Sequence, residues 1–357
     1  MHSISRFQNS VRSLKPICPD CVTLYHMMTM KDLISAFPGN ISDALEIAAN
    51  AEIRQPNHEI HNILICGMGG SGIGGRLVAG WLEDELPVPV CVCNDYMIPS
   101  FVSENTLVIG SSYSGNTEET LSAIQAAVEK GAYLIGICSG GKLEQLCGAL
   151  GFDKVVVPGG NPPRTALAFS IVQLLNIFNK LGLSSAERLN EISKAQNLII
   201  QDESSIKEKA QELAAFLKGN VGILYGTTAY ESVLVRARQQ FNENSKMLCW
   251  HHAIPEMNHN ELVGWGGGDD RFATVFFETE DIHKRNGKRM EITREVIEKK
   301  SSKVMSIHAK GDSKIERSIY LINIVDWASL YLSDLKEVDP IDIEVIDYLK
   351  GSLAEFK

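Results

Sequence analysis

Residues 61–75 have the sequence HNILICGMGGSGIGG, in which a short apolar run ends in a cluster of glycines. A short, uninterrupted apolar run is typical of a strand that is buried on both faces of a parallel sheet. Residues 71–86 then have the pattern of a helix, so the glycines lie at a turn from strand to helix. This stretch therefore predicts the first strand, loop and helix of an α/β domain.

The alternation of strand and helix continues after this stretch. Further strands are predicted to begin near residues 88, 106, 132 and 153, with helices between them. Strands that alternate with helices indicate right-handed crossovers and a parallel sheet. We therefore expect residues 55–160 to form one doubly wound domain of the flavodoxin type.

The second half of the chain repeats this pattern. Residues 163–217 contain only helical patterns. Strand patterns then resume, at residues 221–226, 247–254, 271–278 and 303–309. The order strand, glycine, helix, strand thus occurs twice, starting near residues 62 and 220, which predicts two copies of one α/β unit in tandem.

The predicted organisation has five parts. They are an N-terminal arm or start-site extension (1–29), a first domain with N-terminal helices (30–165), a helical connector (166–218), a second domain (219–335) and a C-terminal helix (336–357). Pro38-Gly39-Asn40 interrupts the helical pattern of residues 31–54, which predicts two helices there.

Composition narrows the classes of protein. The chain has 357 residues, 44% of them hydrophobic and 22% charged, which is typical of a globular protein of about two domains. Its 44 acidic and 34 basic residues give a net charge of −10 without a basic block, which argues against binding to nucleic acid or an anionic membrane. No apolar run is long enough to span a membrane, and the N-terminus lacks the apolar core of a secretory signal.

The eight cysteines indicate the redox compartment. Most of them lie inside apolar runs, as buried free thiols do, which predicts a cytoplasmic location. Cys18-x-x-Cys21 has no second Cys or His pair at the spacing of a zinc finger, and His251, His252 and His259 lack a regular spacing for one metal ion. We therefore expect no metal site.

The glycine loop at residues 67–75 is suited to bind an anion. Its glycines allow the backbone to approach a ligand closely, and the N-terminus of the following helix supplies N–H donors, to which Ser71 adds a hydroxyl. Gly67, Gly69 and Gly72 also match the GxGxxG pattern, and Asp95 lies where a ribose-binding acid would be expected. An NAD-dependent dehydrogenase is therefore an alternative, as is a tight turn that binds nothing.

A second loop, SSYSGNTEET at residues 111–120, follows the third predicted strand. Four hydroxyls, from Ser111, Ser112, Ser114 and Thr117, lie within seven residues of one another. One of them, that of Thr117, is an alternative cap for the next helix. Converging hydroxyl and backbone donors suit a phosphate monoester, so two such loops at neighbouring strand ends favour a sugar phosphate over a dinucleotide.

Together with these two loops, three further motifs carry a resemblance to a known family. They are PPRTALAFS (162–170), QFNENSK (240–246) and EMNHNELVGW (256–265). The two loops resemble those of the sugar isomerase (SIS) domain. The whole set resembles the bifunctional phosphoglucose/phosphomannose isomerase family, from about residue 30 onward. The resemblance implies an α/β fold of two flavodoxin-like doubly wound SIS domains in tandem, with helical N-terminal and C-terminal segments.

The resemblance also implies an activity and a set of site residues. The activity is a cofactor-free aldose–ketose isomerisation, through a cis-enediolate, that interconverts glucose 6-phosphate and mannose 6-phosphate with fructose 6-phosphate. The residues implied to bind the phosphate group are Gly70, Ser71, Ser112, Ser114 and Thr117.

Four further residues have implied roles in the chemistry. Arg164 would lie near C1 and C2, Glu243 would be the base, and His259 would assist ring opening from the partner subunit of a homodimer. Lys350 would be the other ring-opening residue, with Lys336 and Lys357 as substitutes.

The residues alone leave these roles open. Glu256 and Glu261 are alternatives to Glu243, which we expect in a polar turn after a helix that ends near Gln240. Arg164 is otherwise expected to be an exposed residue at the start of a helix. For the whole chain, the alternatives are a non-catalytic regulator that binds sugar phosphates, the dehydrogenase, and an aminosugar isomerase.

Overall fold

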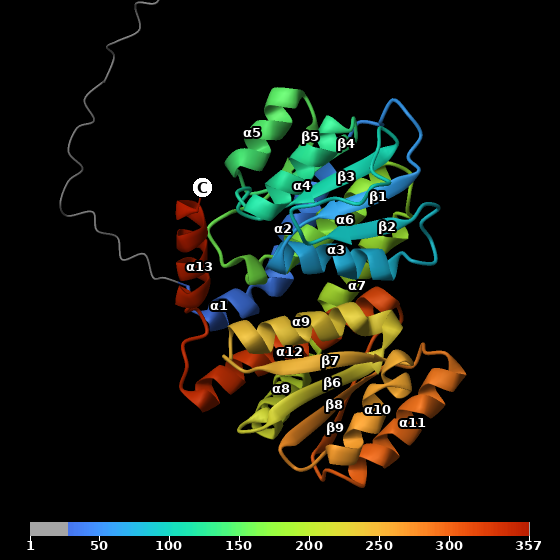
Figure 1. Cartoon of the computed structure of the whole chain (residues 1–357), viewed down its shortest axis with the longest axis vertical. Coiled ribbons are helices and arrows are strands. Elements are labelled where there is room, and N and C mark those ends of the chain that lie inside the picture. Colours follow the sequence, from blue (N-terminus) through green and yellow to red (C-terminus); the bar gives the residue numbers. More distant parts are fainter. Residues whose placement is uncertain (1–27, 357) are drawn as a thin grey trace, which may run out of the picture.

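The computed structural model describes residues 28–356 and consists of two α/β units, one above the other in Figure 1. Each unit is built on a parallel sheet with helices on both faces. The predicted N-terminal arm, apart from residues 28 and 29, lies outside the described residues, as do Cys18 and Cys21. No helix of the described part is both long and apolar enough to cross a membrane.

The first sheet has the strand order β2-β1-β3-β4-β5, and its neighbouring strands are all parallel. Its strands are β1 (Asn62–Cys66), β2 (Val90–Cys93), β3 (Thr106–Ser111), β4 (Tyr133–Cys138) and β5 (Asp153–Val156). This is the order of a flavodoxin-like fold, which confirms the predicted fold class. Because β1 and β3 are adjacent, the loops that follow them leave the same edge of the sheet side by side.

Apolar side chains alternate between the two faces of this sheet, as the period of a strand requires. On one face, Ile63 and Ile65 of β1 pack in a core formed with α2, α3 and α6, while on the other Leu64 packs in a core formed with α4 and α5. The helices of this unit are α2 (Phe37–Asn50), α3 (Gly69–Trp81), α4 (Glu118–Glu129), α5 (Gly141–Leu150) and α6 (Leu167–Lys180).

The two predicted N-terminal helices are present, but the break between them is not where the sequence placed it. α1 (Met30–Ser35) has Ala36 as its C-cap, and Pro38 and Gly39 lie in the first turn of α2. A proline is tolerated in the first turn because its missing N–H has no partner within the helix.

The second sheet has the order β7-β6-β8-β9, which repeats the first four positions of the other sheet. Its strands are β6 (Val221–Thr227), β7 (Cys249–Ile254), β8 (Phe272–Glu278) and β9 (Val304–His308). The α-helices of this half are α7 (Glu187–Gln201), α8 (Glu203–Leu217), α9 (Glu231–Glu243), α10 (Glu261–Gly264), α11 (Lys284–Glu298) and α12 (Lys314–Lys336). Four short 3-10 helices are described, η1 (Pro163–Thr165), η2 (Thr228–Tyr230), η3 (Glu256–His259) and η4 (Trp265–Gly267).

One continuous apolar core joins the two units. It includes side chains from β1 and α6 of the first unit and from α9 and α12 of the second. In addition, the indole N–H of Trp81 in α3 donates to Ser318 Oγ in α12 over 3.0 Å. The helices predicted as a connector contribute to this core: α6 packs on α2 and α3, and α8 packs along α12. The exact domain limits remain predictions.

The C-terminal helix α13 (Glu344–Glu355) is set apart from both cores. None of its side chains is buried, and Figure 1 shows it at the side of the molecule. A segment at residues 337–343 connects it to α12.

Candidate active site

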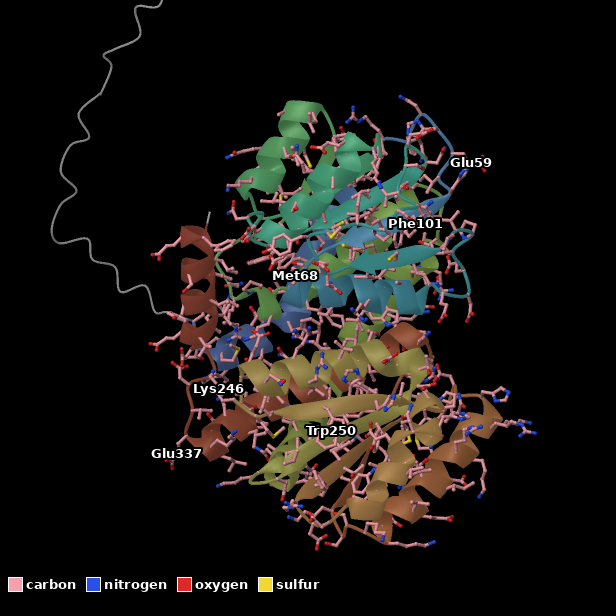
Figure 2. The ribbon with its side chains drawn as sticks, in the orientation of Figure 1. Glu59, Met68, Phe101, Lys246, Trp250 and Glu337 are labelled. Atoms are coloured by element: carbon pink, nitrogen blue, oxygen red, sulfur yellow. The ribbon has the colours of Figure 1, made fainter. Side chains whose placement is uncertain are left out.

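The two predicted anion-binding loops are in direct contact. Ser71, in the first turn of α3, is buried, and its Oγ accepts a hydrogen bond from the backbone N–H of Tyr113 in the second loop over 3.1 Å. A Cβ at Gly67 would lie only 2.7 Å from the carbonyl oxygen of Ser111. The loops thus form one lining at the carboxyl edge of the first sheet (Figure 2, beside the labelled Met68).

The hydroxyls of the second loop do not cap the helix that follows. Thr117 is the N-cap residue of α4 but makes no side-chain cap, so the capping alternative is wrong. Its Oγ1 instead shares a hydrogen bond of 2.9 Å with Ser112 Oγ. Ser114 is exposed, and its Oγ accepts from the N–H of Asn116 over 3.3 Å. The bend needs Gly115, whose φ is +68° and whose Cβ would overlap the Gly140 carbonyl.

The glycine loop also abuts the segment that carries Arg164. A Cβ at Gly70 would lie 2.7 Å from the carbonyl oxygen of Pro163 and 3.3 Å from the Cα of Arg164. Only a residue without a side chain allows this approach. The two loops predicted to bind an anion therefore lie beside Arg164.

Arg164 is buried, with 3% of its side chain exposed, and not the exposed helix-start residue of the alternative. Its Nε donates to Asn244 Oδ1 over 2.8 Å, and one terminal nitrogen donates to the carbonyl of Pro340 over 2.6 Å. The other lies 3.4 Å from Glu243 Oε2. Burial lowers the pKa of Arg164, an effect that the negative charge of Glu243 opposes. A guanidinium nevertheless stays protonated in proteins.

Glu243 is the last residue of α9, so the expectation of a turn after Gln240 is wrong. The helix continues because Asn244 and Ser245 still bond back to the carbonyls of Gln240 and Phe241. The Glu243 side chain is 29% exposed, so its carboxylate faces both Arg164 and solvent. The structure thus brings Arg164 and Glu243 together from the two α/β units.

The alternative glutamates lie elsewhere and are engaged by other groups. Glu261 accepts hydrogen bonds from the Tyr225 hydroxyl and, over 3.0 Å, from Trp250 Nε1. It also pairs with His252 Nδ1 at 2.8 Å. Glu256 accepts from the side chain of Asn260 over 2.9 Å. None of these four contacts involves Arg164.

The structure does not bring His259 or Lys350 to the contact between Arg164 and Glu243. His259 ends η3 and is exposed, and Lys350 is exposed on α13. Of the two substitute lysines, Lys336 donates its Nζ to the carbonyl of Lys246 over 2.9 Å, and Lys357 lies outside the described residues. Within residues 28–356, no group of three or more His, Cys, Asp or Glu side chains is arranged to hold a metal ion.

A buried polar network behind the site was missed from the sequence. Arg236 donates to the carbonyl of Arg164 over 2.8 Å and pairs with Asp326 of α12 at 3.1 Å. Gln240 donates to the same carboxylate over 2.7 Å, and Asn244 donates to Ser329 Oγ over 2.9 Å. The signal was available: residues 236, 240 and 244 are spaced by four, which forms a polar stripe on one face of a helix.

Comparison with known proteins identifies related families and folds. A family model described as the bacterial phospho-glucose isomerase C-terminal SIS domain matches residues 206–353, and the SIS domain model matches residues 58–147. The C-terminal domain of glucosamine-fructose-6-phosphate aminotransferase from Francisella tularensis has a similar fold. Its TM-score is 0.74 at 15% identity, over 88% of this chain and 98% of that one.

Two relatives are similar enough in sequence to define the family. The bifunctional phosphoglucose/phosphomannose isomerase of Caldicellulosiruptor bescii is 38% identical over 338 residues, which cover 92% of this chain and 100% of that protein. The protein of the same name from Thermoplasma acidophilum is 36% identical, over 82% of this chain and 90% of that protein. The resemblance seen in the motifs is confirmed: the chain belongs to the bifunctional phosphoglucose/phosphomannose isomerase family.

Proposed function

We propose that the protein is a cofactor-free aldose–ketose isomerase that interconverts glucose 6-phosphate and mannose 6-phosphate with fructose 6-phosphate. The observation that carries the proposal is the 3.4 Å contact between buried Arg164 and the partly exposed carboxylate of Glu243, beside two anion-binding loops. The relatives that share most of the chain bear the names of both activities.

The chemistry needs a base, a stabilising cation and a phosphate anchor. In the proposed reaction, Glu243 takes the proton from C2 of the open-chain aldose and returns it to C1. The hydroxyl proton on O2 moves to O1, so the product is the ketose and no atom is gained or lost. Arg164 stabilises the negative charge on the enediolate oxygens, which is the kind of preorganised contact that contributes most to such steps.

The phosphate group would be bound by the two loops. Its donors would be the backbone N–H of Gly70 and the hydroxyls of Ser71, Ser112, Ser114 and Thr117. A helix N-terminus beside these hydroxyls suits a dianionic group. The positive pole of α3, which begins at Gly69, adds to this attraction.

Substitution of two glutamates tests the assignment of the base. Glu243→Gln is expected to lower kcat by about 10²–10⁴, the usual contribution of a general base, while sugar phosphate still binds. Glu256→Gln is the matched control at an exposed position and should leave turnover within about twofold, as surface changes do. Turnover of Glu243→Gln at the level of the control would refute the proposal.

We also propose a homodimer in which His259 of the partner subunit assists ring opening at each site, with Lys350 as the second ring-opening residue. His259 is exposed and is not among the groups to which the Arg164 side chain donates, which supports a role at a different subunit's site.

Mixing two inactive variants tests this arrangement. Glu243→Gln and His259→Gln subunits, after exchange, should regain up to about a quarter of wild-type activity, because half of the dimers are mixed and each has one intact site. A mixture that stays inactive, or a fully active monomer in light scattering, would contradict it.

A further inference from the structure

The turn between α12 and α13 accepts hydrogen bonds from two cations, Lys246 and Arg164. Lys246 Nζ donates to the carbonyl oxygens of Asp339 and Asp342, the latter over 2.9 Å. Arg164 donates to the carbonyl of Pro340, which lies between them. Three carbonyls of one short turn therefore point at the ammonium and guanidinium groups beside Glu243.

Both the side chain and the backbone of Lys246 are fixed by hydrogen bonds. The third donor of its ammonium goes to the carbonyl of Glu243 over 2.8 Å, and its own carbonyl accepts from Lys336 over 2.9 Å. Its φ is +47°, a left-handed conformation that is uncommon for residues other than glycine and that the surrounding bonds must maintain. In Figure 2, Lys246 lies close to the segment that leads to α13.

The helix that this turn carries has little else to hold it. None of the side chains of α13 is buried, and Val345, Tyr348 and Leu349 are largely exposed. A helix of 12 residues is marginal on its own in water, so α13 depends on its point of attachment. That point is the turn at residues 339–342.

We propose that Lys246 is a positioning residue that fastens α13 to Glu243, and that it fixes where the C-terminal helix, with Lys350, lies relative to the site. The role of Lys350 in this inference rests on the proposed function, but the attachment of α13 by Lys246 does not. Its three hydrogen bonds go to backbone carbonyls of both segments that it joins, Glu243 on one side and residues 339 and 342 on the other.

Hydrogen exchange of the full-length protein tests the attachment without reference to activity. Lys246→Met should raise exchange in residues 344–355 by about tenfold to a hundredfold, the factor expected from losing charge-assisted hydrogen bonds, with the two sheets unchanged. Lys246→Arg should restore most of the protection. Lys299→Met, an exposed lysine in the second unit, is the control and should change nothing in α13.

Steady-state kinetics test the positioning of Lys350. Lys246→Met should lower kcat more than it changes KM, and its effect should largely disappear in a Lys350→Met background, because the two act through the same helix. Unchanged exchange in α13 would overturn the inference, as would faster exchange spread evenly over the chain. If Lys246→Met does not fold, Lys246→Gln replaces it and must show the same localised exchange. An inactive wild type with the predicted exchange pattern would refute only the proposed function.

Discussion

The guanidinium of Arg164 is satisfied by groups from separate parts of the chain: Asn244 and Glu243 at the end of α9, and the carbonyl of Pro340 after α12. Removing such a buried cation from water is costly, and each of these bonds offsets part of that cost. Their combined effect is to fix the direction of the guanidinium, which an enzyme needs if the group is to stabilise a developing negative charge.

His251 offers a test at the same scale. Its side chain is 11% exposed, and burial lowers its pKa to about 4, with the positive charge of Arg238 acting in the same direction. The unfolded chain, with an ordinary value near 6.5, therefore binds more protons between pH 4 and 6.5. The stabilisation is present above pH 6.5 and is lost as the pH falls toward 4.

We expect this one residue to account for about 2 kcal/mol of the stability lost between pH 7.5 and pH 5. Urea unfolding of His251→Asn at the two pH values should show a correspondingly smaller difference than the wild type. His61→Asn, at an exposed position, is the matched control. A pH dependence of His251→Asn equal to that of the wild type would contradict the assignment.

Among the elements, α3 shows most clearly why its glycines are needed. Gly70 lies against the Pro163 carbonyl, whereas Gly80, ten residues later in the same helix, has only Ser232 Oγ at 3.8 Å from an added Cβ. Gly70→Ala should therefore push η1 and Arg164 away, at a cost of about 1–3 kcal/mol in unfolding free energy, together with a loss of kcat/KM. Denaturant unfolding and steady-state kinetics measure the two effects.

The control lies in the same helix. Gly80→Ala should leave activity intact and stabilise the protein by about 0.5–1 kcal/mol, because alanine is the better helix former. Equal effects of the two substitutions would show that the close contact of Gly70 with η1 does not matter.

The strands and helices were predictable because apolar periodicity records which faces are buried. The parallel arrangement of both sheets followed from the alternation of strand and helix, and the two loops predicted to bind an anion were recognisable from their composition. The break between α1 and α2 was misplaced, since Pro38 is as acceptable in a first turn as after a last one. Likewise, polar residues at 242–244 suggested the end of a helix that in fact continues through Glu243 to bury Asn244.

Contacts between distant segments were not predictable in the same way. That Arg164 meets Glu243, Asn244 and Pro340 depends on how the two units pack, and no local pattern encodes it. The catalytic roles of Arg164 and Glu243 were predicted from the family resemblance and not from the residues alone. Lys246 gave no signal, because its partners are backbone carbonyls, which every residue has.

For the molecule as a whole, the junction of the two units contains the apolar core that they share. It also contains the polar residues that hold Arg164 in place. Arg236 and Asp326 form a buried ion pair there, and Arg236 also holds the carbonyl of Arg164. Burial raises the pKa of Asp326, and the positive charge of Arg236 opposes this shift. The pair therefore links α9, α12 and η1 in one arrangement.

Breaking this pair should be far more harmful than replacing it. Arg236→Met is expected to destabilise the protein by about 3–5 kcal/mol, because it leaves the Asp326 carboxylate buried without its cation. The double variant Arg236→Met/Asp326→Leu should recover most of that stability but not the activity, since the Arg164 carbonyl still lacks its donor. Denaturant unfolding of the two variants, with turnover measured in parallel, checks both statements. A double variant as active as the wild type would show that the hydrogen bond from Arg236 to the Arg164 carbonyl is not needed for activity.

Proton exchange tests the central claim most directly. Purified protein would be incubated with fructose 6-phosphate in D2O, without added cofactor or metal, and the products followed by NMR. A Glu243-centred enediolate mechanism predicts deuterium at C2 of both glucose 6-phosphate and mannose 6-phosphate, formed about 10²–10⁴ times more slowly by Glu243→Gln. Bound fructose 6-phosphate with neither aldose formed would contradict it, and would point instead to a sugar-phosphate-binding protein without catalysis.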